Sequence, residues 1–158
     1  MLTQSIVSGS QAAGVIPGVI KSRFGDVAVD AARVLTFPRG LLGMPDRFQF
    51  VLANFPNEKM AQFKLLQSLD DQALSFITLP VELQNPIVAQ ADIQMACRDL
   101  GIDDNELAML LIVSVHRTPD QVKLSVNARA PLMIDAGRRL GVQHVFQSDD
   151  YKVQHMLG

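Results

Sequence analysis

The chain has 158 residues, 48% of them hydrophobic, and a formal net charge of −2 at pH 7. This length predicts one domain, since domains of about 100–200 residues are usual, with enough apolar side chains for a core. The charge balance argues against direct nucleic-acid binding, because proteins that bind nucleic acid normally present a basic face.

The first 22 residues predict a flexible N-terminal arm. Residues 1–22 carry one charged side chain, Lys21, and are rich in Gly, Ser and Ala. They contain the apolar stretch GVIPGVI, so docking of the arm on the domain or on a neighbouring chain remains open. Neither a signal peptide nor a membrane helix is expected, because the start is not basic and no apolar run approaches the roughly 18 residues of a span. The single cysteine, Cys97, excludes an intramolecular disulfide and is typical of a reducing, cytoplasmic location.

Residues 23–158 predict a single β-rich domain. Strand-like runs at 33–37 and 47–55 flank the stretch FPRGLLGMPDRF, whose proline and glycine residues indicate a shaped loop. Further strands are expected from apolar runs or apolar–polar alternation. These strands cover 63–68, 73–79, 107–115, 122–130, 132–135 and 142–146. Pro131 interrupts the last alternation and is expected at a strand boundary, bulge or edge.

Residues 91–101, ADIQMACRDLG, contain the clearest helical pattern. Asp92 is a plausible N-cap and Gly101 a plausible stop, while Ile93, Cys97 and Leu100 fall on one face. The whole pattern predicts a mainly β protein, a small antiparallel β-barrel-like fold with one or two short helices.

The sequence contains no recognisable catalytic, metal or cofactor motif. The histidines His116, His144 and His155 are not spaced as metal ligands, and no cysteine pair completes a zinc site. The acidic pairs at 70–71, 103–104 and 149–150 are expected to form turns. We therefore predict a binding protein with no cofactor.

One enzymatic alternative remains open at this point. A small barrel enzyme could use Asp70, Asp71, His116 or Arg138. It would require a polar pocket that gathers two or more of these side chains. A barrel filled by Phe48, Phe50, Phe76, Leu124 and Val126 would exclude it.

Five stretches, in this order and spacing, resemble the FliW family of flagellar assembly factors. The stretches are SRFGDVAVDAARVLTFPRGLLGMPDRFQFVL, FKLLQSLDDQALSFITL, LLIVSV, SVNARAPLMID and SDDYKVQHML. The similarity spans about residues 22–156. The chain departs from the family at Leu65, where an aromatic is frequent, at Gln72, where proline is frequent, and at Asp135, where asparagine is usual. Residues 80–95 match poorly.

The resemblance implies a non-enzymatic protein that binds flagellin in the cytoplasm. It also implies binding to the carbon storage regulator CsrA, an RNA-binding repressor of translation. When flagellin is exported, the freed factor would sequester CsrA, and flagellin mRNA would be translated again. The alternative is a flagellin-specific chaperone without a CsrA branch. Neither reading includes a nucleic acid or a membrane as a direct partner.

The candidate partner-binding residues come from the shaped loop, the acidic turns and exposed strand positions. They are Leu41, Leu42, Met44, Pro45, Asp70, Asp71, Asn127, Arg129, Pro131, Asp149, Asp150 and Tyr151. Leu41 and Leu42 could instead plug one end of the barrel, and Met44 could cap the core. The acidic residues that could act against CsrA are Asp70, Asp71, Asp103, Asp104, Glu106, Asp149 and Asp150.

Overall fold

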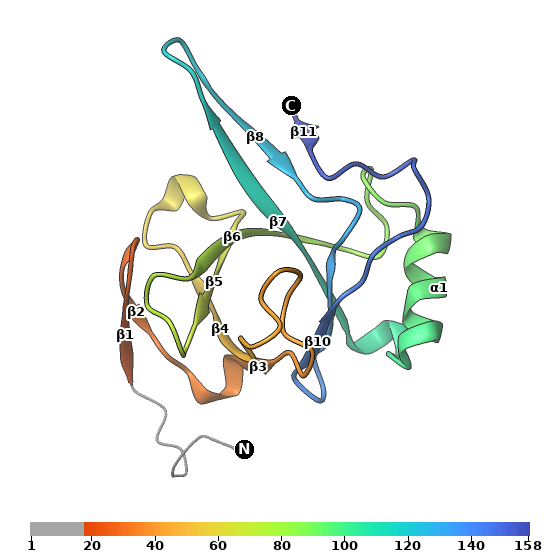
Figure 1. Ribbon diagram of the computed structural model, residues 1–158, viewed down its shortest axis with the longest axis horizontal. Helices are drawn as coiled ribbons and strands as arrows, with labels where there is room; N and C mark the ends of the chain where they lie inside the picture. The colour runs from red at the N-terminus through yellow and green to blue at the C-terminus, as the bar shows by residue number, and fades with distance from the viewer. Residues whose placement is uncertain (1–17) are drawn as a thin grey trace.

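A ring-like sheet dominates the computed structural model, which describes residues 18–158 (Figure 1). The sheet contains nine strands in the order β11-β8-β7-β6-β5-β4-β3-β10-β9, and a further β7–β9 pairing closes the ring. The strands are β3 (Val34–Thr36), β4 (Gln49–Asn54), β5 (Lys64–Ser68), β6 (Ser75–Val81), β7 (Leu107–Arg117), β8 (Val122–Val126), β9 (Leu132–Asp135), β10 (Leu140–Gln143) and β11 (His155–Leu157). The prediction of a mainly β, antiparallel fold is therefore confirmed.

The ring is weakest between β3 and β10. This pairing is parallel and contains a single register pair, Leu140 opposite Thr36. The Thr36 N–H also donates to the Arg139 carbonyl at 3.0 Å. The other strand pairings are antiparallel and longer, so the sheet is ring-like rather than a strict barrel.

The interior of the ring is filled by apolar side chains. Phe37 and Phe50 pack edge to face at a centroid distance of 5.6 Å, and Leu66, Leu110 and Leu132 surround them. The Phe37 ring lies over Gly141 of β10, where an added Cβ would approach the ring to 2.4 Å. This glycine therefore creates the space in which the aromatic pair sits.

A second core lies outside the ring, beneath the helix α1 (Gln90–Leu100). The apolar face of α1 places Ile93, Ala96 and Cys97 against β7, β8 and β9. Burial raises the pKa of the Cys97 thiol. β7 is apolar on both faces because it serves both cores. Beyond the ring, β7 continues with β8 as a projecting hairpin (Figure 1).

The helix ends as predicted but begins differently. Gly101 adopts φ +73°, and the N–H groups of Gly101 and Ile102 bond to the last helical carbonyls. The expected N-cap, Asp92, is wrong: Ala89 occupies the cap position without a side-chain bond. The helix begins before the expected position, so Asp92 lies in its first turn. There the Tyr151 hydroxyl donates to the Asp92 carboxylate and accepts from the Ala89 N–H. The short 3-10 helices are η1 (Ala31–Arg33), η2 (Glu58–Met60) and η3 (Asp104–Glu106).

Near the N-terminus, β1 (Val19–Ser22) and β2 (Gly25–Ala28) form a separate hairpin. It packs through Ile20 and Val27 on the outer face of β4 and β5, and Arg23 donates to Ser75 at 2.9 Å. The last residues of the expected arm thus form β1, while residues 1–17 lie outside the described residues. Within 18–158, no helix has the length and apolar character of a membrane span.

Two strand predictions near the C-terminus are wrong in extent. The expected strand over 122–130 ends at Val126, because the Asn127 side chain accepts the Ala130 N–H at 3.0 Å and turns the chain. The expected strand at 142–146 instead covers Leu140–Gln143. Pro131 directly precedes β9, as expected for a strand boundary.

Candidate functional site

The loop over residues 37–48 projects from one end of the ring. Its tip is tight, because Leu41 and Met44 exchange backbone hydrogen bonds of 3.1 and 2.9 Å. Gly40 and Gly43 hold positive φ angles of +66° and +80°. These bends direct Leu41 into the ring and leave Leu42 outside it. Leu41 is 4% exposed and Leu42 is 55% exposed.

The turn over residues 69–73 lies beside this loop. The Ser68 hydroxyl accepts the N–H groups of Asp70 and Asp71 at 3.1 Å. The buried Gln67 side chain supports the turn from below, with its Nε2 atom 3.1–3.3 Å from four carbonyl oxygens. Arg47 of the 37–48 loop approaches the Asp71 carboxylate at 4.0 Å. Loop and acidic turn therefore form one continuous surface.

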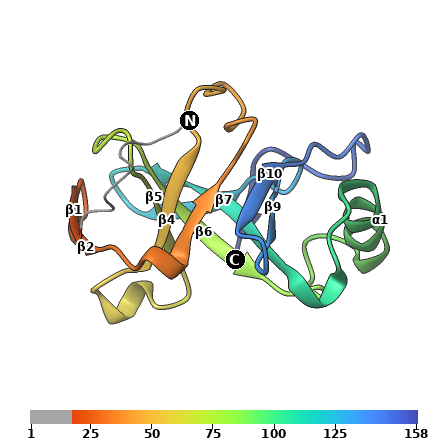
Figure 2. The same ribbon diagram turned by 90° about the horizontal axis from the view of Figure 1, so that it is seen from below.

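Gln143 of β10 connects the 37–48 loop to a third segment. Its Oε1 accepts the Leu42 N–H at 2.9 Å, and its Nε2 donates to the Ala130 carbonyl at 3.1 Å. The 127–131 segment is joined in turn to the chain at 144–152, since Arg129 pairs with Asp149 at 3.3 Å. In Figure 2 the 37–48 loop and the 144–152 segment extend toward the same side of the ring. We call the surface formed by residues 37–48, 69–73, 127–131 and 144–152 the loop face.

The predicted partner-binding residues are gathered on the loop face but differ in exposure. The exposed ones are Leu42, Pro45, Asp70, Asp149 and Asp150, and the half-buried ones are Met44, Asp71, Asn127 and Arg129. The buried ones are Leu41, Pro131 and Tyr151. Leu41 lies in the ring interior, which agrees with the alternative that it plugs one end of the barrel. The role of each residue in binding stays a prediction.

Tyr151 is a buried residue that links two segments, a role that the sequence pattern around it does not indicate. It is buried against Phe146, and its hydroxyl contacts the first turn of α1. Burial, together with the hydrogen bond to Asp92, raises the pKa of the Tyr151 phenol. The residue anchors the C-terminal segment to the helix.

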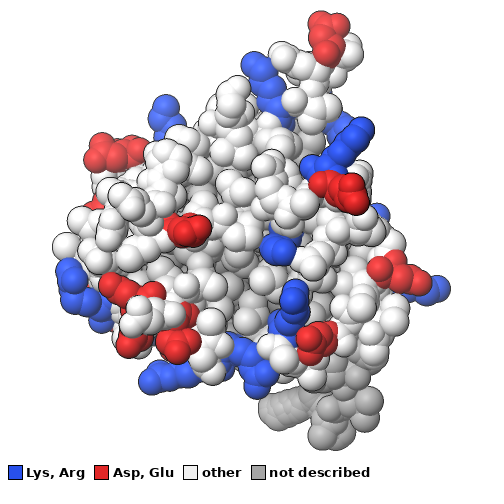
Figure 3. Space-filling model, turned by 180° about the vertical axis from the view of Figure 1, so that it is seen from behind, with Lys and Arg blue, Asp and Glu red and all other residues white. Residues whose placement is uncertain are grey.

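The remaining acidic candidates lie apart from the loop face. Asp103, Asp104 and Glu106 surround η3, where the Asp103 carboxylate accepts the Asn105 N–H at 2.9 Å. On the face shown in Figure 3, behind that of Figure 1, several acidic groups lie close together at the lower left, and basic groups lie along the lower edge.

The polar residues considered for an enzyme lie on separate elements. His116, on the β7–β8 hairpin, is 2.7 Å from the Ser125 hydroxyl, Arg138 lies in the β9–β10 turn, and Asp70 and Asp71 lie on the loop face. The expected filling of the barrel is right for Phe50 and Phe76 but wrong for Phe48, Leu124 and Val126. Phe48 is exposed, and the other two belong to the second core. Among residues 18–158, no group of three potential metal ligands is found.

Gln143 is not among the residues that the sequence predicts for the site. It lies in a short strand and carries no motif, and its two partners come from distant segments. No local signal in the sequence identifies such a bridge.

Comparison with known proteins gives a consistent result. The sequence model described as "FliW protein" matches residues 18–157. A protein of Clostridium botulinum (strain Alaska E43 / Type E3) named "Flagellar assembly factor FliW" is 29% identical over 136 residues, covering 84% of this chain and 92% of that protein. A protein of the same name from Natranaerobius thermophilus is 29% identical over 142 residues, covering 88% and 91%.

A solved structure supports the fold. The crystal structure of the flagellar assembly factor FliW superposes with a TM-score of 0.66 and covers 89% of this chain and 97% of that one. At 24% identity this likeness concerns the fold alone.

Proposed function

The chain belongs to the FliW family, and on this premise we propose that it binds flagellin in the cytoplasm and antagonises the translational regulator CsrA by protein–protein contact. It is a flagellar assembly factor and not an enzyme. In the proposed cycle, flagellin and CsrA compete for the protein. Export of flagellin frees the protein to bind CsrA, which relieves repression of flagellin mRNA. The family match over residues 18–157 is the observation that carries this proposal.

The loop face supports the proposal because it combines a fixed backbone with exposed apolar area. Leu42 is held by Gln143 and by the Leu41–Met44 bridge, and it remains largely in solvent. Phe48, at the base of the same loop, is also exposed. Because the loop is already ordered in the free protein, binding of a partner costs less conformational entropy than it would for a flexible loop.

A partner switch sets a limit on the two affinities. One partner must displace the other at cellular concentrations, and each tenfold difference in affinity corresponds to about 1.4 kcal/mol. The two free energies of binding should therefore lie within a few kcal/mol of each other. A shared surface is the simplest way to make the two partners exclusive.

The charge distribution favours binding beside the RNA site of CsrA over imitation of RNA. A net charge of −2 is small for a mimic of a polyanion. The loop face nevertheless carries the exposed carboxylates of Asp70, Asp149 and Asp150. Placed near the RNA site, they would repel phosphates and, together with the bulk of the protein, prevent RNA binding.

A mobility-shift experiment tests the switch in one tube. CsrA is bound to the leader of its flagellin mRNA, this protein is added, and flagellin is added last. We expect the protein to release RNA and flagellin to restore the CsrA–RNA complex. If RNA stays bound with unchanged affinity while the protein also binds CsrA, the antagonist function is wrong. If the protein binds flagellin but never CsrA, the chaperone alternative is correct.

A further inference from the structure

The β1–β2 hairpin is held on the ring by its side chains. Among residues 18–158, it forms a sheet of its own and makes no backbone hydrogen bond to the ring. Figures 1 and 2 both show it on the side of the ring opposite α1. A two-stranded hairpin is only marginally stable by itself in water. Its place on the ring therefore depends on a small number of side-chain contacts.

The apolar part of this contact is small. Ile20 and Val27 are the buried side chains of the hairpin, and they pack on Ala53 and Leu65 of β4 and β5. The ring interior and the second core each bury many more apolar side chains. Segments with few buried apolar contacts open locally at a lower free energy than the core. We therefore expect the hairpin to open as a unit while the ring stays folded.

Arg23, in the turn of the hairpin, makes the polar part of the contact. Its Nε atom donates to the Ser75 hydroxyl and its Nη2 atom to the Ser75 carbonyl, both at 2.9 Å. The guanidinium also lies over the Phe24 ring, 4.8 Å from the centroid, which restricts its orientation. One planar group thus holds both the side chain and the backbone of a single ring residue.

Ser75 is placed to transmit this contact to the loop face. It is the first residue of β6, directly after the acidic turn, and it lies opposite Gln67 in the β5–β6 register. The Gln67 Nε2 atom contacts the carbonyls of the turn and of Leu74, whose carbonyl also accepts the Ser68 N–H. Among the described residues the buried Oε1 atom of Gln67 has no hydrogen-bond partner. The amide is therefore anchored through the turn carbonyls, and a shift at the start of β6 would disturb the whole arrangement.

We propose that Arg23 is a positioning residue for the acidic turn, so that docking of the β1–β2 hairpin regulates partner binding on the loop face. With the hairpin docked, Arg23 fixes Ser75, and the turn presents Asp70 and Asp71 in one arrangement. With the hairpin open, both bonds to Ser75 are lost and the turn becomes more mobile. A partner that binds the ordered turn also favours the docked hairpin, because coupling between two sites is reciprocal. The inference rests on the proposed function in taking the loop face as the contact surface.

Amide hydrogen exchange of the free protein, followed by NMR, tests the coupling without a partner. The N–H groups of Asp70 and Asp71 donate to the Ser68 hydroxyl, so their exchange reports the order of the turn. We expect Arg23→Gln to accelerate exchange at these two amides at least fivefold more than at the core amides of β7. Unchanged exchange at both amides would leave Arg23 as an anchor of the hairpin alone and overturn the proposal.

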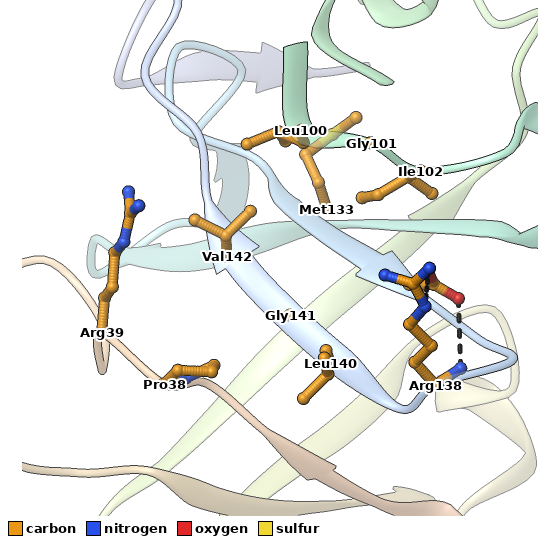
Figure 4. Close-up of a pocket in the computed structure, with 11 residues that line it drawn as sticks. Pro38, Arg39, Leu100, Gly101, Ile102, Met133, Arg138, Leu140, Gly141 and Val142 are labelled. Atoms are coloured by element: carbon orange, nitrogen blue, oxygen red, sulfur yellow. Dashed lines mark hydrogen bonds and ion pairs between the residues drawn. The ribbon is translucent and has the colours of Figure 1, made fainter. Parts of the chain in front are cut away.

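Two matched variants control for the loss of charge. Lys21→Gln removes an exposed positive charge from the same hairpin, and Arg138→Gln makes the same substitution elsewhere. Figure 4 shows Arg138 with its partner Asp135, in a groove of about 210 Å³ between β10 and the C-terminal end of α1. Neither side chain bonds to Ser75, so exchange in the acidic turn should not change. An effect as large as that of Arg23→Gln in either variant would contradict the proposal.

A double-mutant cycle locates the action of Arg23 at Ser75. Ser75→Ala removes one of the two acceptors, and it should accelerate exchange in the acidic turn less than Arg23→Gln does. The double variant should exchange no faster than Arg23→Gln alone, because the same contact is removed in both cases. Effects of the two substitutions that multiply would show independent paths and would argue against transmission through Ser75.

Partner titrations separate this proposal from the proposed function. Flagellin and CsrA are each titrated into the wild type and into Arg23→Gln. For the partner that contacts the acidic turn, we expect at least threefold weaker binding to the variant, and slower exchange in β1 and β2 of the bound wild type. Unchanged affinity for both partners would contradict the regulation and leave the proposed function standing. If neither partner binds the wild type, the proposed function fails, and exchange in the free variant still decides whether Arg23 positions the turn.

Discussion

The Oε1 atom of Gln143 accepts the backbone N–H of Leu42 across 101 positions of sequence, at 2.9 Å. The Nε2 atom of the same side chain donates to the Ala130 carbonyl. One residue of β10 therefore fixes the 37–48 loop relative to the 127–131 segment. The loop face depends on this bridge for its shape.

Gln143→Leu should lower the free energy of unfolding by about 1–2 kcal/mol, because it leaves a donor and an acceptor without their partners. Urea unfolding measures the loss, and hydrogen exchange at Leu42 should accelerate. Gln147→Leu, at an exposed position, should change stability by no more than about 0.5 kcal/mol. Equal losses in the two variants would contradict the bridging role.

Gly40 and Gly43 are glycines for different reasons: both have a positive φ angle, but only Gly40 also lacks room for a side chain. Both hold positive φ angles, but a Cβ on Gly40 would lie 2.4 Å from the Met44 carbonyl oxygen, whereas a Cβ on Gly43 meets nothing within 4 Å. Gly43→Ala should therefore cost about 1 kcal/mol from backbone strain alone. Gly40→Ala should cost clearly more, because the backbone of the loop must move. Urea unfolding of both variants makes the comparison, and a Gly43→Ala loss as large as that of Gly40→Ala would contradict it.

Leu41 and Leu42 should respond in opposite ways to truncation. Leu41→Ala removes a side chain from the ring interior and should cost about 2–4 kcal/mol of stability. Leu42→Ala removes an exposed side chain and should leave stability within about 0.5 kcal/mol. If the loop face binds flagellin, Leu42→Ala should weaken that binding about tenfold in calorimetry. Unchanged affinity would remove Leu42 from the contact surface.

We expect the free energy of unfolding to depend on pH through the half-buried His144. Burial lowers its pKa from the usual 6.5, and the Asp99 carboxylate opposes this only in part. Since the folded state favours the neutral imidazole, the contribution of His144 to the free energy of unfolding is fully present above pH 6.5. It is lost as the pH falls below 6.5 toward the lowered pKa of the folded protein.

Urea unfolding between pH 5 and 8 measures this effect. The free energy of unfolding of the wild type should fall more steeply below pH 6.5 than that of His144→Gln, which lacks the titrating group. Parallel profiles for the two proteins would show that another group causes the pH dependence. The comparison uses slopes, because the variant also loses the edge-to-face contact with Phe146.

Local patterns in the sequence were sufficient for most of the strands and for the end of the helix. Gly101 stops α1 as its position predicts, and the alternation in 122–126 forms β8. The errors occur where tertiary contacts outweigh local preference. Asp92 does not cap the helix because α1 begins earlier, at Gln90, and the Asp92 carboxylate accepts a hydrogen bond from the distant Tyr151. β11 was missed because a strand of three residues is too short for a recognisable period.

The site was less predictable than the fold. Adjacent leucines carry no information on which of them faces the core, and only the backbone bends at Gly40 and Gly43 separate Leu41 from Leu42.

The most direct test of the partner switch is a pair of calorimetric titrations of this protein, with flagellin and with CsrA from the same cell. We expect each partner to bind alone, and we expect saturation with one partner to abolish or markedly weaken binding of the other. Tight binding of flagellin alone would support a chaperone without a CsrA branch. Simultaneous binding of both partners with unchanged affinities would contradict the switch.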